Sequence, residues 1–329
     1  MVRIAHISDS HLGASMFQLS ERREDARKCL KKAVDMAKRH SPDLLVHTGD
    51  LFDSPFPSVK DVDFAMAIFK QLDFPIVVIQ GNHDIPYGYR YSQSPVRMFE
   101  TTELVLSTGN TGHRRTVIEC DGKNLELHMF SWMRGRTLAR LIREHTPEED
   151  LCVLLSHDIG LSFDELPSHY DYIGMGHAHN FMLREDDSIG RPGSTCIVDW
   201  KREMGGKSKL IIVDIDREGV EFETESLNDV REFKFLTGLD VTGMGPEEIN
   251  TVMKEWLNKL SRKKQGKPII IMQVNGLVHS DTENMINRSG LIEYGEEKLD
   301  PLFLHIEPNW ENLGPRSVEF SSPLDVMNT

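Results

Sequence analysis

Short runs of apolar, mostly β-branched residues recur along the first two thirds of the chain. Their length and composition are typical of buried strands. The strands that this pattern predicts lie at residues 3–7, 44–47, 76–80, 125–130, 152–155, 172–175 and 210–215. Between the first two, Ala26, Leu30, Ala33, Val34 and Ala37 form one apolar stripe at helical spacing, and a second helix is predicted around residues 62–72. Strands that alternate with helices predict an α/β domain.

The pattern changes between residues 226 and 245, where Asn, Asp, Gly and Thr interrupt the periodicity. Pro246 is well placed to begin a helix, and Ile249, Met253 and Leu257 follow it on one helical face. A strand-like run at 268–274 comes next. We therefore expect a main domain over residues 1–230, a small α+β domain over 231–310, and a tail over 311–329.

The composition is that of an ordinary globular protein, with 39% hydrophobic and 27% charged residues. No apolar stretch is long enough to cross a bilayer, and the first residues do not form a signal peptide. The four cysteines are far apart and form no C-x-x-C pair, which favours reduced thiols. These features predict a cytoplasmic protein that makes no membrane association.

A formal net charge of −14 argues mildly against nucleic-acid binding, because phosphate contacts need lysine and arginine. Binding depends on a local patch, however, and carboxylates around bound metals also count as negative in this sum. The basic stretch at 256–267, which contains Arg262, Lys263 and Lys264, is more often a solvated surface than a DNA contact. Both interpretations of this stretch stay open.

Five clusters of polar residues each follow one of the predicted strands. The clusters are Asp9-Ser10-His11, Gly49-Asp50, Gly81-Asn82-His83-Asp84, Ser156-His157-Asp158 and Gly176-His177-Ala178-His179. Ligands of open α/β sheets bind beyond the carboxyl ends of the strands, so these clusters should converge on one cleft. Taken singly, most of them could be ordinary turns or structural histidines. Taken together and in this order, they favour a functional site.

The residue types in these clusters suit two adjacent divalent metal ions. Carboxylate, imidazole and amide oxygen favour Mn²⁺, Fe²⁺ or Zn²⁺ over Ca²⁺. The spacing predicts that Asp9 and His11 lie on the same side of an extended strand, as do His177 and His179. The carboxylate of Asp50 could bridge two ions. Two ions about 3.5–4 Å apart can generate a hydroxide at neutral pH and clamp a phosphoryl group.

The order D-x-H, GD, GNHD, H, GHAH resembles the calcineurin-like metallophosphoesterase superfamily. That resemblance implies an α/β fold of two facing β-sheets flanked by helices, here with a small α+β capping domain. The opening at residues 6–13, the stretch Gly49-Asp50-Leu51-Phe52-Asp53 with the prolines after it, and Pro192-Gly193-Ser194 resemble the Mre-eleven and SbcD family of repair nucleases.

This resemblance implies a manganese-dependent DNA exonuclease and endonuclease that acts on DNA ends in double-strand-break repair. It also implies a homodimer that works with an SMC-like ABC ATPase of the Rad-fifty or SbcC type. One Mn²⁺ of each subunit would be held by Asp9, His11, Asp50 and His179. The other would be held by Asp50, Asn82, His157 and His177. His83 would act on the substrate phosphate or the leaving oxygen, and Asp84 would orient its ring.

Two other functions compete with this one. The same fold could hydrolyse phosphoesters of small molecules or phosphoproteins, or it could be a scaffold that has lost its activity. The complete ligand set weakens the scaffold hypothesis, and the repair-like motifs favour DNA over small substrates. The chain departs from the family at Asp53, where relatives often have His, and after residue 311, where no helix for docking the ATPase is predicted.

Overall fold

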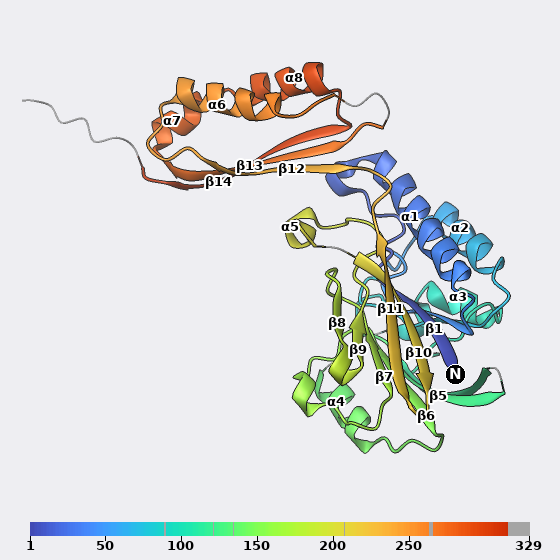
Figure 1. Ribbon diagram of the computed structural model, residues 1–329. Helices are drawn as coiled ribbons and strands as arrows, with labels where there is room; N and C mark the ends of the chain where they lie inside the picture. Colours follow the sequence, from blue (N-terminus) through green and yellow to red (C-terminus); the bar gives the residue numbers. More distant parts are fainter. Residues whose placement is uncertain (89, 121, 134, 207, 263–265, 315–329) are drawn as a thin grey trace, which may run out of the picture. The chain divides into compact units, whose positions relative to one another are not determined.

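The structure is a computed structural model that describes residues 1–314 except 89, 121, 134, 207 and 263–265. It divides into two compact units, Met1–Val230 and Arg231–Thr329 (Figure 1). Among the described residues, no helix combines the length and the apolar character that crossing a membrane requires.

Two β-sheets form the centre of the first unit. The five-stranded sheet has the order β11-β10-β1-β2-β3, and the six-stranded sheet has the order β4-β5-β6-β7-β9-β8. The strands of the first are β1 (Val2–Ile7), β2 (Leu44–His47), β3 (Ile76–Val78), β10 (Ser208–Asp216) and β11 (Gly219–Leu227). Those of the second are β4 (His113–Cys120), β5 (Lys123–Phe130), β6 (Leu151–Ser156), β7 (Tyr172–Met175), β8 (Met182–Arg184) and β9 (Ile189–Arg191). The neighbours β1, β2 and β3 are parallel, as are β5, β6, β7 and β9.

The two sheets face each other across a shared apolar core. Ile4 and Val46 of the first sheet belong to the same buried cluster as Leu127 and Val153 of the second. Successive side chains of a strand point to opposite faces, so the neighbouring residues, such as Ala5, face outward and meet helices. This layering confirms the expected fold of two facing sheets flanked by helices.

Helices cover the outer face of each sheet (Figure 1). The helices α1 (Ser20–Arg39), α2 (Val59–Phe69) and α3 (Val96–Thr101) bury apolar side chains against the five-stranded sheet. Every member of the predicted α1 stripe is buried. The helix α4 (Gly135–Glu144) packs on the other sheet through Leu138 and Ile142. Short 3₁₀ segments lie at Met16–Gln18, Tyr91–Gln93, Phe163–Glu165 and Glu185–Asp187.

The second unit has a three-stranded parallel sheet, β12 (Phe233–Asp240), β13 (Ile269–Val278) and β14 (Phe303–Asn312). Its helices, α6 (Pro246–Asn258), α7 (Ser280–Met285) and α8 (Arg288–Leu299), lie along one face of this sheet (Figure 1). Ile249, Met253 and Leu257 on α6 belong to its core, as the helical spacing predicts. The pairing of β14 with β13 continues to Asn312, so the strand includes the start of the predicted tail. Residues 315–329 of that tail lie outside the described residues.

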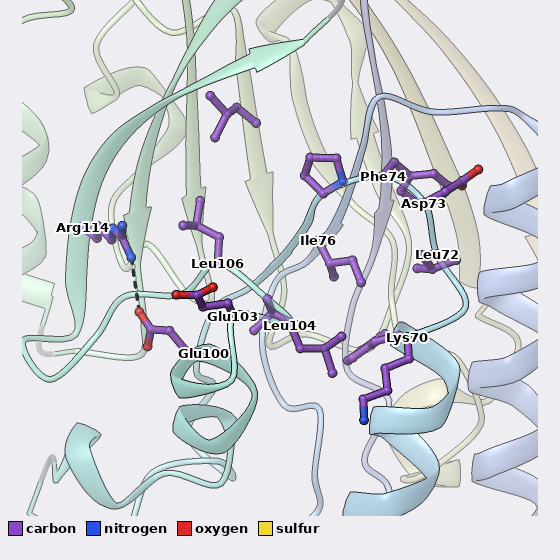
Figure 2. A pocket seen from close by; sticks show the side chains of 14 residues that line it. Lys70, Leu72, Asp73, Phe74, Ile76, Glu100, Glu103, Leu104, Leu106 and Arg114 are labelled. Atoms are coloured by element: carbon purple, nitrogen blue, oxygen red, sulfur yellow. Dashed lines mark hydrogen bonds and ion pairs between the residues drawn. The ribbon is translucent and has the colours of Figure 1, made fainter.

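A hollow of about 690 Å³ opens on the first unit between the end of α2, the segment after α3, and β4 (Figure 2). Apolar side chains such as Leu72, Ile76 and Leu104 line it, and an ion pair of 3.4 Å joins Arg114 to Glu100 at its rim. No residue of the five polar clusters lines this hollow. The chemistry therefore lies elsewhere on the unit.

Candidate metal centre

The five polar clusters meet at one edge of the two sheets. Asp9, Asp50 and Asn82 follow β1, β2 and β3, which are neighbours in the first sheet, and His157 and His177 follow β6 and β7, which are neighbours in the second. Among the described residues, four groups of donor atoms could hold a metal ion. The group of His11, Asp53 and His83 shares His11 with this edge, and the group of Glu126, His145 and Cys152 contains no residue of the five clusters. The other two groups adjoin each other at this edge. One consists of Asp9, His11 and His179 and the other of Asp50, His157 and His177, and the ligand atoms of each group lie within 4.8 Å of one another. The structure therefore brings together the side chains that the sequence predicts to converge.

The backbone at these positions differs from the extended strand that the spacing suggested. Asp9, His11, Asp50 and His177 have positive φ angles of 50°, 42°, 51° and 68°. Non-glycine residues rarely adopt this left-handed region, at a cost of order 1–3 kcal/mol each. Backbone hydrogen bonds of 3.0 Å from Asp9 N to the Gly49 oxygen and from His11 N to the Asp50 oxygen hold the loops in place. The pairs converge because the chain turns after each strand, and not because Asp9 and His11 lie on an extended strand as the spacing predicted.

Two glycines of the motifs are required by close approach. A Cβ atom at Gly81 would lie 2.1 Å from the Asp50 Oδ1 atom, and one at Gly49 would lie 2.4 Å from the His157 Nδ1 atom. Gly49 also has a φ of 102°, which disfavours a side chain. These glycines allow three separate loops to pack directly around the Asp50 carboxylate.

The first donor group joins two histidine rings and a carboxylate. The Nε2 atoms of His11 and His179 lie 3.2 Å apart. The Oδ1 atom of Asp9 lies 3.9 Å from the His179 Nε2 atom, and both oxygens of Asp9 accept from the backbone N–H of His177 at 3.2 Å. Asp9 is fully buried, so its carboxylate faces the imidazoles rather than solvent.

The second donor group is centred on an amide oxygen. The Oδ1 atom of Asn82 lies 3.0 Å from both the His157 Nε2 atom and the His177 Nδ1 atom. The Oδ2 atom of Asp50 lies 3.3 Å from His157 Nε2 and 3.6 Å from His11 Nε2. One carboxylate oxygen therefore lies between the two groups. The other, Oδ1, accepts a 2.8 Å hydrogen bond from the His83 backbone N–H.

Outer contacts fix which nitrogen faces inward in three of the four rings. The Nδ1 atom of His11 contacts Asp53 Oδ1 at 3.2 Å, that of His179 contacts Glu203 Oε1 at 3.0 Å, and that of His157 contacts the Thr48 carbonyl at 2.8 Å. Carboxylate and carbonyl oxygens accept, so each Nδ1–H donates. In the neutral ring this leaves the Nε2 lone pair directed at the site.

The carboxylate oxygens and imidazole lone pairs of the two donor groups therefore lie close together, and a positive charge among them would stabilise this arrangement. Burial lowers the pKa of His11 and His157, but the carboxylates outweigh it. Asp53, Asp50 and Asp9 raise the pKa of His11 to about 9, and Asp50 and Asp9 raise that of His157 to about 10. The rings bind protons when nothing else supplies positive charge. Carboxylate, imidazole and amide donors gathered in two groups around one shared carboxylate fit a pair of divalent metal ions.

His83 and Asp84 have separate partners. The His83 ring is exposed and its Nδ1 atom lies 3.0 Å from the Asp53 carbonyl oxygen. The Asp84 carboxylate is fully buried and accepts from the backbone N–H groups of Gly81, Leu51 and Phe52. Burial, followed by the charge of Asp50, raises the pKa of Asp84 to about 7. The contacts assign Asp84 to holding the loop, where the sequence suggested that it orients the His83 ring.

Comparisons with known proteins show the family to which the chain belongs. The family model described as calcineurin-like phosphoesterase matches residues 2–186. The DNA double-strand break repair protein Mre11 of Methanococcus maripaludis is 38% identical over 87% of this chain and 82% of that protein. The chain belongs to the Mre11 family of calcineurin-like phosphoesterases. The Mre11 of Thermoplasma acidophilum is 28% identical over 84% of the chain and 78% of that protein, and the Mre11 of Methanopyrus kandleri is 25% identical over 97% and 75%.

Membership of the Mre11 family of calcineurin-like phosphoesterases implies a dinuclear divalent metal site, and the two donor groups fit it. The resemblance seen in the motifs is confirmed. His6 and His47 lie beside the site as buried, neutral rings. His6 bonds Tyr172 and Thr48, and His47 bonds Ser10. Burial lowers the pKa of each to about 3.

The sequence did not reveal several residues around the centre. Glu203, at the end of the short helix α5 (Trp200–Glu203), contacts the His179 ring. The Trp132 ring lies 4.9 Å from the His177 ring, centre to centre. Neither residue stands in a motif with the histidine that it contacts. A tryptophan at the end of a strand-like run was the only available signal for Trp132.

Proposed function

We propose that this protein is a Mn²⁺-dependent nuclease that hydrolyses phosphodiester bonds at DNA ends in double-strand-break repair, with exonuclease and endonuclease activity. The position of the Asp50 Oδ2 atom between the two donor groups carries this proposal. We assign one ion to Asp9, His11, Asp50 and His179 and the other to Asp50, Asn82, His157 and His177. Nitrogen and oxygen donors of intermediate hardness favour Mn²⁺, with Fe²⁺ and Zn²⁺ as other candidates.

When bound, two such ions supply a strong nucleophile from water at neutral pH and neutralise charge on the phosphate. The protein contributes the placement of these groups. Asp50 is fixed by the His83 N–H, and the rings of His11, His179 and His157 are held by their Nδ1 contacts. The exposed His83 ring donates from Nδ1 to the Asp53 carbonyl. In the doubly protonated ring, Nε2–H is then the group that can donate to the substrate phosphate or pass its proton to the leaving oxygen.

DNA is favoured over a small substrate by two features of the chain. The named relatives are DNA repair proteins, and their similarity extends over most of the chain. A second unit beyond the phosphoesterase domain fits a capping domain that contacts DNA, here residues 231–310. Of the basic residues considered for that contact, Arg262 is paired with Asp300 at 3.2 Å, and Lys263 and Lys264 lie outside the described residues.

Digestion assays test this function directly. Plasmid and linear duplex DNA should be cleaved with Mn²⁺, weakly or not at all with Mg²⁺, and not with EDTA. A chromogenic phosphodiester is the comparison substrate. If the small diester is hydrolysed much faster than DNA is cleaved under every condition, the alternative is favoured. That alternative is a phosphodiesterase or phosphatase that acts on small molecules or phosphoproteins.

We further propose a homodimer that works with an SMC-like ABC ATPase of the Rad-fifty or SbcC type. Within the first unit, apolar side chains are exposed where α2 begins and along α3. Val59 is 85% exposed and Met98 is 45% exposed, and both line a hollow of about 560 Å³. Other residues of α2, including Ala65 and Phe69, are buried in the core. The exposed set therefore remains available for a second subunit.

Placing charges on this surface should produce a monomer. The double variant Val59→Glu/Met98→Glu puts two carboxylates into the proposed apolar interface, which would have to be desolvated on association. Light scattering at micromolar concentration should report a dimer for the parent and about half that mass for the variant. Val117→Glu, at an exposed position on β4, is the matched control and should remain a dimer. A parent protein that is strictly monomeric would count against this assembly.

A further inference from the structure

The two metal positions differ in what holds their histidines from behind. In the group of Asp9, His11 and His179, both rings rest on carboxylates, Asp53 at 3.2 Å and Glu203 at 3.0 Å. In the group of Asn82, His157 and His177, the Nδ1 atom of His157 rests on the uncharged carbonyl of Thr48. Carboxylates therefore lie behind the histidines of the first position, whereas a neutral carbonyl lies behind His157 at the second.

Glu203 is buried, and both of its carboxylate oxygens accept hydrogen bonds. It is only 5% exposed. Its Oε1 atom accepts from the Val198 N–H at 3.0 Å and the Asp199 N–H at 2.7 Å, besides the His179 ring, and its Oε2 atom accepts from the Ser194 hydroxyl at 2.5 Å. These donors fix both oxygens. The carboxylate can therefore set the plane of the His179 ring.

A carboxylate behind an imidazole acts differently from a carbonyl. Both select the tautomer whose Nε2 lone pair faces the ion, but the carboxylate also adds negative charge and makes the ring a stronger ligand. Asp53 is 41% exposed on its side chain, so solvent weakens its contribution, whereas Glu203 is buried.

The balance of charge agrees with this difference. Asp53 and Glu203 lie behind the first position. Asp9 is a ligand there but also acts electrostatically on His157 and His177, and Asp50 is shared. The second position has the shared Asp50 and the neutral amide of Asn82 as ligands, with Asp158 acting electrostatically on the His177 ring. A divalent ion should gain more from the first set.

We propose that Glu203 is a positioning residue which, through His179, makes the Asp9–His11–His179 position the tighter of the two metal positions and the first to fill. This inference rests on the proposed two-metal function.

Titration of metal-free protein with Mn²⁺ tests it, by calorimetry and by the paramagnetic resonance signal of free Mn²⁺. The parent should bind two ions in two separable steps. Glu203→Gln keeps the size of the side chain and an acceptor oxygen but removes the charge. It should weaken the first step by about 10–100-fold and leave the second nearly unchanged. Ser194→Ala, which removes only a hydroxyl that holds Glu203, should weaken the same step by a smaller factor.

Glu165→Gln is the control, because Glu165 bonds Ser162 and Arg143 rather than a residue of the site. It should bind both ions like the parent. Equal affinities in the parent, or a Glu203→Gln variant that weakens both steps alike or neither, would overturn the inference. If those results come with two bound ions and DNA cleavage in the parent, the proposed function survives. A parent that binds no ion overturns both.

Discussion

The Asp50→Ala variant should lose both metal ions and all measurable cleavage of DNA. The Oδ2 atom of Asp50 lies 3.6 Å from His11 Nε2 and 3.3 Å from His157 Nε2, so one oxygen serves both donor groups. Its removal also frees the His83 N–H and leaves His11 and His157 without their nearest shared anion. Because loss of a supporting contact already costs about 10–100-fold in metal affinity, loss of the bridging ligand should cost more for each ion.

Asn82→Ala is the matched comparison, since Asn82 contacts His157 and His177 of one group only. It should retain about one ion per chain. Elemental analysis of purified proteins, after removal of loosely bound metal, measures both variants against the parent. If Asp50→Ala retains two ions, Asp50 does not bridge them. Equal losses in the two variants would show that the groups do not bind independently.

The sequence was sufficient to locate the centre because its donors follow buried strands. A strand buried on both faces reads as a continuous apolar run, so β1, β2, β6 and β7 could be placed to within a residue or two. The polar residues immediately after such runs must lie at the carboxyl edge of a sheet. Their convergence therefore does not depend on how the chain turns there.

Edge strands and several helices, α8 among them, were not predicted from the sequence. The sequence of β4, HRRTVIEC, is mostly polar, and β11 alternates between exposed and half-buried residues, because each strand lies at the edge of its sheet. The helix α8 buries Leu291, Gly295 and Leu299, and a glycine in the middle of that stripe hides the periodicity.

Side-chain partners could not be predicted where they depend on turns or distant segments. Glu203 reaches His179 only because the chain returns to the site through α5. Asp84 follows His83 directly, which suggested that the two side chains interact. In the turn closed by the Asp84 N–H and the Gly81 carbonyl, however, Asp84 points into the protein and His83 points outward. Adjacent residues in a turn need not share a direction.

The outward orientation of the His83 ring leads us to expect that its removal slows cleavage without loss of metal. His83→Ala should keep both metal ions, keep the fold and still bind DNA, yet cleave about 10²–10⁴-fold more slowly, as expected for loss of a positioned acid. The ring is exposed and its Nδ1 atom is bonded to the Asp53 carbonyl, while the contact with Asp50 comes from the backbone N–H, which alanine retains. The substitution therefore removes the ring that we propose meets the substrate and leaves the backbone contact with Asp50 in place.

His177→Ala is the comparison that separates chemistry from metal binding. The His177 Nδ1 atom lies 3.0 Å from Asn82 Oδ1, within a donor group, so its loss should lower metal content together with activity. Metal content, DNA affinity in the presence of Ca²⁺, and single-turnover cleavage with Mn²⁺ should be measured for both variants. The two roles are distinct only if His83→Ala contains as much metal as the parent and His177→Ala contains less. Loss of an ion from His83→Ala would make His83 a ligand and assign the proton transfer to another group.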